Sequence, residues 1–244
     1  MKVMKNQLFR VGGCVRDKIL GVKTNDIDYT FVVGNPNLSV AQGFAEMEAY
    51  LKKNKFEIFL ITADCYTIRA RFPNDHVHKG LTADFVMARK EIGYYEGTRR
   101  PILELGTLED DLFRRDFTLN AMAEDEEGNL IDPFGGLISL RLGVLRTPND
   151  PNITMAEDPL RLLRAFRFSI TRNFTIAPEI NKILLEFDYE RDMRVVSLER
   201  IREELFKCFK HNTLETIQVL HFFPNLRDYL FKNNLLWLKP TLEK

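Results

Sequence analysis

The sequence predicts an α+β protein, in which a mixed head of strands and helices is followed by an all-helical part. Short apolar runs bounded by turn residues fill the first part of the chain, and helical spacing of apolar residues fills the rest, with the change near Pro148. A chain of 244 residues has room for one large domain or two small ones. We expect a head at residues 1–140, a helical neck at 141–210 and a short helical segment at 211–244.

The head is expected to alternate strands and helices closely. Gln7–Val11 and Ile27–Val33 are apolar runs typical of strands, and a helix starts between them at Val15. The elements expected next are a helix over Ser39–Asn54, strands over Phe56–Ile61, Thr67–Phe72 and Ala83–Ala88 with a hairpin loop at Pro73–Gly80, a helix over Leu108–Met122, a turn at Asp132–Gly136, and a short helix and strand up to Arg146.

The second half of the chain has helical spacing and almost no strand pattern. The helices expected there cover Ala156–Thr171, Pro178–Phe187, Ser197–Lys210 and Asn212–Phe222. Neither half contains an internal repeat or a low-complexity segment.

The composition argues against several classes of protein. No segment approaches the roughly 18 apolar residues of a membrane span, and the N-terminus lacks the apolar core of a signal peptide. The three cysteines are scattered, which predicts free thiols in a reducing cytoplasm. Lys and Arg number 35, as do Asp and Glu, and this zero net charge argues against strong nonspecific binding to nucleic acid.

The strongest functional motif combines a glycine turn with two acidic residues. Gly12 and Gly13 follow an apolar strand and open a helix, and such a turn lets backbone N–H groups approach phosphate. Asp26 and Asp28 stand two positions apart at the next strand, so both side chains point to one face of a sheet. Their repulsion is relieved by a cation, and Mg²⁺ held by carboxylates and substrate phosphates fits. The alternative is a pair of exposed strand carboxylates.

A third carboxylate would complete a two-metal site for nucleotidyl transfer. Asp84 begins the apolar run of a neighbouring strand and is the candidate, the alternative being a charge at a strand end. Arg16 lies one turn into the helix after the glycines, within reach of a bound triphosphate. A surface ion pair with Asp17 is the alternative for Arg16.

A polar group interrupts the apolar pattern of residues 114–122. At helical spacing Arg115, Asp116 and Asn120 would gather on one side of a helix. Arginine suits phosphate, and aspartate and asparagine suit sugar hydroxyls, so this side would contact a nucleotide. The alternative is a salt-bridged helix cap.

A second acidic and basic motif opens the helical part. Asp158, Arg161 and Arg164 would step around one helix by about 60° each, with Arg167 further round. A carboxylate beside a guanidinium offers an acceptor and a donor, which matches the Watson–Crick edge of cytosine or adenine and rejects guanine and uracil. An ion pair on a solvated helix is the alternative.

Five motifs follow one another over about residues 9–210. They are Gly12-Gly13-x-Val15-Arg16-Asp17, Asp26-x-Asp28, Arg114-Arg115-Asp116-Phe117-Thr118-x-Asn120-Ala121, Asp132-Pro133-Phe134-Gly135-Gly136 and Glu157-Asp158-x-x-Arg161. Together they resemble the motifs of the class II tRNA nucleotidyltransferases, or CCA-adding enzymes, and of the related bacterial poly(A) polymerases.

The resemblance implies a polymerase-β-type nucleotidyltransferase head and an enzyme that adds C, C and A to the 3′ end of tRNA from CTP and ATP, with release of pyrophosphate. It implies Mg²⁺ at Asp26 and Asp28, with Asp84 as the third catalytic carboxylate. The residues implied to bind nucleotide are Gly12, Gly13, Arg16, Arg115, Asp116 and Asn120 in the head, and Asp158, Arg161, Arg164 and Arg167 as a protein template for the base. Arg89–Pro101 is similar to the flexible loop that the family uses for the final A.

The chain departs from the family pattern near its C-terminus. Family members continue into a helical body that grips tRNA, of which residues 211–244 would be a short remnant. A homo-oligomer or a partner chain would then supply tRNA-binding surface. The alternative activities are those of a poly(A) polymerase and of an enzyme that adds only A or only CC. A catalytically silent, nucleotide-binding regulatory protein is the alternative from another class.

Overall fold

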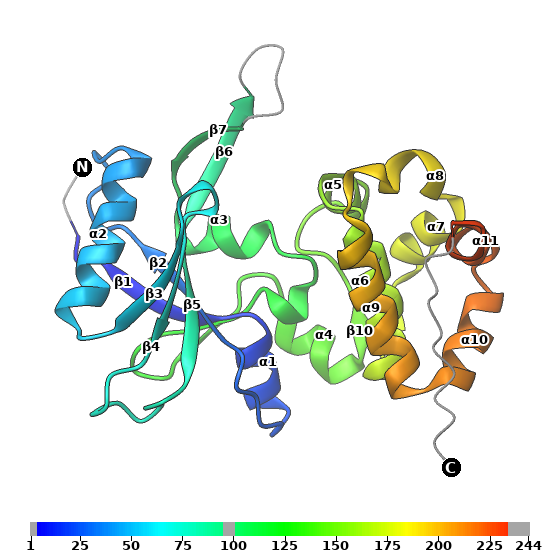
Figure 1. Ribbon diagram of the computed structural model, residues 1–244, viewed down its shortest axis with the longest axis horizontal. Helices are drawn as coiled ribbons and strands as arrows, with labels where there is room; N and C mark the ends of the chain where they lie inside the picture. The colour runs from blue at the N-terminus through cyan, green and yellow to red at the C-terminus, as the bar shows by residue number, and fades with distance from the viewer. Residues whose placement is uncertain (1–3, 95–100, 234–244) are drawn as a thin grey trace. The chain divides into compact units, whose positions relative to one another are not determined.

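The chain forms two compact units, residues 1–137 and 138–244. The computed structural model describes residues 4–94 and 101–233 (Figure 1). No helix among these residues is long and apolar enough to cross a membrane. The further division expected at residue 211 remains a prediction.

The first unit is built on a mixed sheet of seven strands. Their spatial order is β3-β4-β5-β2-β1-β8-β9. Parallel pairing joins β2 to β5, and antiparallel pairing joins the other neighbours. The strands are β1 (Gln7–Val11), β2 (Ile27–Val32), β3 (Glu57–Thr62), β4 (Thr67–Arg71), β5 (Thr82–Met87), β8 (Ala123–Glu124) and β9 (Leu130–Ile131).

Helices cover both faces of this sheet. Phe31 and Thr30 are successive residues of β2, so they point to opposite faces. Phe31 packs on Tyr50 of α2 (Val40–Lys53), with ring centroids 5.3 Å apart. Thr30 donates to Asp111 of α3 (Leu108–Phe113), and Figure 1 shows α2 and α3 on opposite sides of the sheet. A third helix, α1 (Gly13–Ile19), follows β1 directly.

A hairpin extends from the same unit. β6 (Arg89–Tyr94) and β7 (Pro101–Leu105) pair antiparallel. The stretch Arg89–Pro101, expected to be a flexible loop, is therefore strand at its beginning and at its end. Its central residues, 95–100, lie outside the described part of the chain.

The expected helix over Leu108–Met122 is wrong beyond Phe113. Phe117 has extended backbone (φ −132°, ψ 149°) and precedes η2 (Thr118–Asn120), a single 3₁₀ turn. The carboxylate of Asp116 accepts a hydrogen bond from the backbone N–H of Phe117 at 2.8 Å. Such a local side-chain bond offers the backbone an alternative to the helix, which is why the helix ends early.

The motif Asp132–Gly136 has a structural role in the first unit. The two carboxylate oxygens of Asp132 accept from the backbone N–H groups of Gly136 and Leu137, at 2.7 and 2.9 Å. They cap the start of α4 (Gly136–Leu142). A Cβ on Gly136 would lie 2.2 Å from the carbonyl oxygen of Thr118, so only glycine allows this approach to η2.

The second unit is almost entirely helical, as expected, and the α+β fold class is confirmed. The helix α6 packs along α9, and a short parallel pair of strands is the exception. The elements are β10 (Val144–Leu145), α5 (Pro151–Glu157), α6 (Leu160–Thr171), β11 (Thr175–Ile176), α7 (Pro178–Glu186), α8 (Tyr189–Asp192), η3 (Met193–Val195), α9 (Leu198–His211), α10 (Thr213–His221) and α11 (Pro224–Lys232).

The expected helix over Ala156–Thr171 is two helices. Asp158 has extended backbone (φ −141°, ψ 95°) because the ring of Pro159 disfavours helical geometry in the residue before it. The placement of Asp158 on a helix face is therefore wrong. This residue lies in the break between α5 and α6.

We predict that Gly136→Ala lowers the free energy of unfolding of the first unit by about 2 kcal/mol or more, because the new Cβ meets the Thr118 carbonyl. Gly13→Ala is the matched control, since its Cβ would lie at an ordinary van der Waals distance from the nearest atom, Arg16 Nη2, at 3.5 Å. We expect it to change stability by less than about 1 kcal/mol. Chemical denaturation measures both variants, and equal losses would contradict the role given to Gly136.

Candidate active site

Strand pairing brings two of the three predicted carboxylates to one face of the sheet, and the third lies next to them in sequence. Asp28 of β2 and Asp84 of β5 are direct partners in the parallel ladder, so their side chains leave the sheet on the same side. Asp26 is exposed just before β2, and its charge acts on Asp28. The sequence pattern therefore identified a real cluster of acidic groups.

This cluster is electrostatically strained. The pKa of Asp28 is raised to about 6, first by burial and then by the negative charges of Asp26 and Asp84. The positive charges of Arg115 and Arg69 oppose the shift. A cation bound here would stabilise the ionised carboxylates against their mutual repulsion. The cluster therefore favours binding of a cation.

The donor set suits a hard divalent ion that is shared with a substrate. Among residues 4–94 and 101–233, no three His, Cys, Asp or Glu side chains are arranged to hold an ion by themselves. Mg²⁺ needs only one or two protein carboxylates when water and phosphate oxygens complete its octahedron. The paired carboxylates of Asp28 and Asp84 are enough for that requirement.

Arg69 is a neighbour of the acidic cluster that the sequence motifs do not include. Arg69 of β4 is the direct antiparallel partner of Asp84. Its Nε and Nη2 atoms donate to the two carboxylate oxygens of Asp84, the first at 2.7 Å. The sequence motifs gave no signal for it, because β4 alternates Arg69 and Arg71 with apolar residues as an ordinary half-exposed strand does. Only the register shows which acidic residue faces it.

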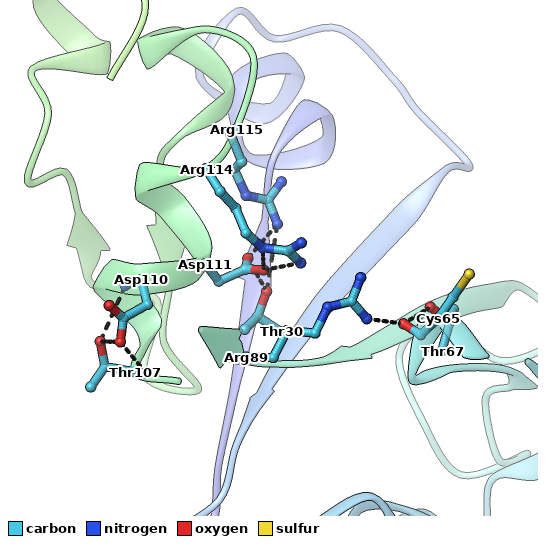
Figure 2. A network of polar contacts seen from close by, with 9 residues as sticks. All are labelled: Thr30, Cys65, Thr67, Arg89, Thr107, Asp110, Asp111, Arg114 and Arg115. Carbon is cyan, nitrogen blue, oxygen red and sulfur yellow. Dashed lines mark hydrogen bonds and ion pairs between the residues drawn. The ribbon is translucent and has the colours of Figure 1, made fainter. Parts of the chain in front are cut away.

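A buried network supports the site from the side of α3. Figure 2 shows the guanidinium groups of Arg114 and Arg115 converging on the carboxylate of Asp111, which is 2% exposed. Arg115 Nη2 lies 2.8 Å from it, Arg114 Nη2 2.9 Å, and the Thr30 hydroxyl donates to it at 2.7 Å. Burial alone would raise the pKa of Asp111. The two arginines and the hydrogen bonds outweigh burial and hold the pKa at about 2.

The start of β6 is fixed nearby. Figure 2 shows the guanidinium of Arg89 reaching the carbonyl oxygen of Cys65, to which it donates a hydrogen bond. The guanidinium also lies 5.6 Å from the centre of the Tyr66 ring. These contacts tie the base of the hairpin to the turn between β3 and β4.

Arg115 lies against the glycine turn. A Cβ on Gly12 would be 2.7 Å from Arg115 Nη1, and Gly12 has a φ of 77°, so two separate constraints require glycine there. The Nε atom of Arg115 is buried and has no hydrogen-bond partner among the described residues. Asp111 thus holds one edge of this guanidinium, while the rest faces the turn that opens α1.

Arg16 belongs to a second buried network. Its Nη1 donates to Asn120 Oδ1 at 2.6 Å, and Asn120 Nδ2 donates to Asp116 Oδ1 at 2.9 Å. Arg16 also pairs with Asp17, at 2.8 Å, but this pair is buried and not at the surface. The structure therefore brings Arg16, Asp116 and Asn120 together, although the helix that was to group the last two does not form.

The predicted base-reading residues of the second unit are held by their own neighbours. Asp158 Oδ1 accepts from the backbone N–H of Leu160 at 3.2 Å, and its Oδ2 lies 3.0 Å from Arg200 Nη2 of α9. Arg161 Nη1 donates to the Thr154 carbonyl at 2.9 Å. Asp158 and Arg161 thus frame the break between α5 and α6, and Arg200 is a further residue that the sequence motif did not include.

Arg164 and Arg167 have different surroundings. Arg167 donates through Nε to Glu204 of α9, a buried carboxylate that Lys207 also contacts at 3.2 Å. The Arg167 guanidinium lies 4.2 Å from the centre of the Phe168 ring, and that of Arg164 lies 5.8 Å from it. Arg167 therefore ties α6 to α9.

Comparisons with known proteins agree with this arrangement. Residues 8–146 match the family model described as the poly A polymerase head domain. A multifunctional CCA protein of Janthinobacterium is 35% identical over 235 residues. The match covers 94% of this chain and 50% of the Janthinobacterium protein. The chain spans about half the length of the curated relatives it matches.

Solved structures show the same likeness. The Thermotoga maritima CCA-adding enzyme complexed with tRNA superposes with a TM-score of 0.70 at 28% identity, over 96% of this chain and 50% of that one. A CCA-adding enzyme complexed with ATP gives a TM-score of 0.71 at 30% identity, with the same coverage of 96% and 50%.

We predict that Asp111→Asn lowers the free energy of unfolding by about 3 kcal/mol at pH 7, because it leaves Arg114 and Arg115 without a buried counter-charge. The pKa of Asp111 is depressed, so its contribution is complete above about pH 4 and is lost as the pH falls towards 2. Wild type should lose more stability over that interval than the variant. Denaturation curves at several pH values measure the difference.

The neighbouring carboxylate of Asp110 provides the control for this prediction. It caps the exposed start of α3 through Thr107, as Figure 2 shows. Asp110→Asn should cost less than about 1 kcal/mol and leave the acid response unchanged. An acid response that Asp111→Asn also leaves unchanged would refute the assignment to Asp111.

Proposed function

The chain belongs to the class II tRNA nucleotidyltransferases and bacterial poly(A) polymerases, the family of the poly A polymerase head domain, and we propose that it adds CMP and AMP to the 3′ end of tRNA without a nucleic-acid template. The family resemblance noted in the sequence is confirmed by the comparisons. The reaction is a nucleotidyl transfer from CTP or ATP that releases pyrophosphate.

One observation supports the proposal above all others. Asp28 and Asp84 are in register on one sheet face, with Asp26 beside them and a glycine turn next to Arg115. Phosphoryl transfer needs a place for a metal ion and a place for the triphosphate. A cluster of acidic groups can hold the first, and a glycine turn beside an arginine can hold the second. Either feature alone would be compatible with simple nucleotide binding.

In this proposal, different residues of the head contact the triphosphate and the sugar. Gly12 and Gly13 let the triphosphate approach the backbone, and Arg115 and Arg16 offset its charge. Asp116 and Asn120, joined by a hydrogen bond, contact the sugar. Because Asp111 and Asp116 fix these side chains before substrate binds, little reorganisation is needed during the reaction.

The cofactor we propose is Mg²⁺, held by Asp26 and Asp28 with Asp84 as the third carboxylate. When bound, it activates the attacking 3′-hydroxyl and stabilises the triphosphate and the leaving pyrophosphate. The side chains orient the two substrates around it. Substitution of Asp26 therefore removes the chemistry and leaves the glycine turn intact.

Base choice belongs to the second unit. Asp158 accepts from the exocyclic amine and Arg161 donates to the ring nitrogen of cytosine or adenine, with Arg164 alongside. Arg200 keeps the Asp158 carboxylate oriented. Arg167, bonded to Glu204, holds α6 in place and so supports the template residues.

The partners follow from this reaction. They are the 3′ end of tRNA, CTP and ATP. A second copy of the chain or a partner chain would add tRNA-binding surface. We also propose a cytoplasmic location, since the described cysteines are free and thiols persist in a reducing compartment.

A gel assay with Mg²⁺ and tRNA transcripts that end at the discriminator base, at C and at CC tests the activity. With CTP and ATP we expect each transcript to be extended until its 3′ end is CCA and no further. The variant Asp26→Ala should incorporate no nucleotide. Long A tails would instead identify a poly(A) polymerase, and arrest at CC or extension of CC ends only would identify a partial-adding enzyme. Nucleotide binding without incorporation would contradict the proposal.

We predict that Asp158→Ala lowers the rate with CTP and ATP and reduces discrimination against GTP and UTP by at least about tenfold, because the acceptor for the exocyclic amine is lost. Incorporation rates with the four nucleotides measure this. Asp192→Ala, an aspartate of α8 paired with Arg191, is the control and should change neither quantity. A variant at Asp158 that excludes GTP and UTP as strictly as wild type would overturn the template role.

A further inference from the structure

We propose that Arg69 is an internal cation that competes with a divalent ion for Asp84, and so weakens metal binding at this carboxylate until substrate arrives. The inference rests on the proposed function, because it concerns the same acidic cluster. It assigns a role to a residue that lies outside all five sequence motifs.

Strand register places Arg69 beside the cluster. Across three adjacent strands, Asp28 of β2 pairs with Asp84 of β5, and Asp84 pairs with Arg69 of β4. Paired residues point to one face, so the three side chains form a row that ends in a positive charge. The position of this charge follows from the backbone pairing and not from the conformation of a long side chain.

The contact occupies the whole carboxylate of Asp84. Two nitrogen atoms of Arg69 donate to its two oxygens in the bidentate geometry that makes arginine–carboxylate pairs strong. Asp84 is the only hydrogen-bond partner of the Arg69 side chain among the described residues. Any ion that binds Asp84 therefore shares the carboxylate with a guanidinium or displaces it.

Arg115, the other arginine near the cluster, cannot compete with a metal ion in this way. It is held by buried Asp111 and by Thr30 of β2. Arg69 has no such anchor in the described structure, and its side chain is 48% exposed. It is the cation that can leave its carboxylate and move into solvent.

Two opposite effects of Arg69 on metal binding can be compared. It orients Asp84, which for an exposed ion pair is worth at most about fivefold in affinity. It also repels a divalent ion on the same carboxylate, and even with the screening of water this repulsion at about 5 Å amounts to roughly tenfold. Repulsion is the larger effect, so loss of Arg69 should tighten metal binding.

The competition has a consequence for the order of events. A divalent ion binds weakly at Asp84 while the guanidinium is there. Negatively charged substrate attracts both cations and lowers the cost of separating Arg69 from Asp84. Arg69 thereby links full occupancy of the acidic cluster to the presence of substrate.

The experiment measures Mn²⁺ binding to the 244-residue chain without nucleotide, by the electron paramagnetic resonance signal of free Mn²⁺. Arg69→Ala and Arg69→Gln should tighten binding about tenfold. Arg69→Lys keeps the charge and should stay within about threefold of wild type. In an Asp84→Asn background, Arg69→Ala should have no effect, because the shared carboxylate is gone.

Arg71→Ala is the matched control. Arg71 lies two residues further along the same strand and face, is 50% exposed, and pairs with Glu57. Its removal deletes the same charge without touching the cluster, so Mn²⁺ affinity should change by less than about twofold. Circular dichroism and thermal unfolding of each variant check that the fold is retained.

The possible results separate this inference from the proposed function. Unchanged or weaker Mn²⁺ binding by Arg69→Ala overturns the competition, while normal binding by wild type leaves the proposed metal site standing. If Arg69→Ala tightens Mn²⁺ binding equally in the Asp84→Asn background, the competition is also overturned. The effect would then come from the general charge of Arg69 and not from its contact with Asp84. Absence of Mn²⁺ binding in every form overturns both the inference and the metal site of the proposed function.

Discussion

The parallel pairing of β2 with β5 is the constraint on which the candidate site depends. It sets Asp28 beside Asp84 on one face, and with Asp26 it concentrates three negative charges there. Repulsion of this size must be offset by cations. The guanidinium groups of Arg69 and Arg115 offset part of this charge, and a divalent ion with substrate phosphates would complete the balance.

Buried polar groups support the side chains of this site. Asp111 fixes Arg115 against the glycine turn, and Asp116 fixes Asn120, which in turn holds Arg16. Each carboxylate is satisfied by several donors, so the networks avoid the penalty of a buried unpaired charge.

The second unit uses the same principle with different residues. Pro159 breaks the helix and leaves Asp158 in extended backbone, where Arg200 of α9 holds its carboxylate. Arg167 and Glu204 add a second bond between α6 and α9. These bonds fix the Asp158 carboxylate and the position of α6 on α9.

The sequence by itself determined the fold class, most elements and the main acidic and glycine motifs, because strand alternation, helical spacing and turn residues are local properties. It was wrong where a local side-chain bond ends the helix at Asp116 and where Pro159 breaks the helix at Asp158. Tertiary structure alone decided that Arg69 faces Asp84 and that Arg16 meets Asn120. Those pairings depend on strand register and on packing between segments far apart in the chain, and neither leaves a local pattern in the sequence.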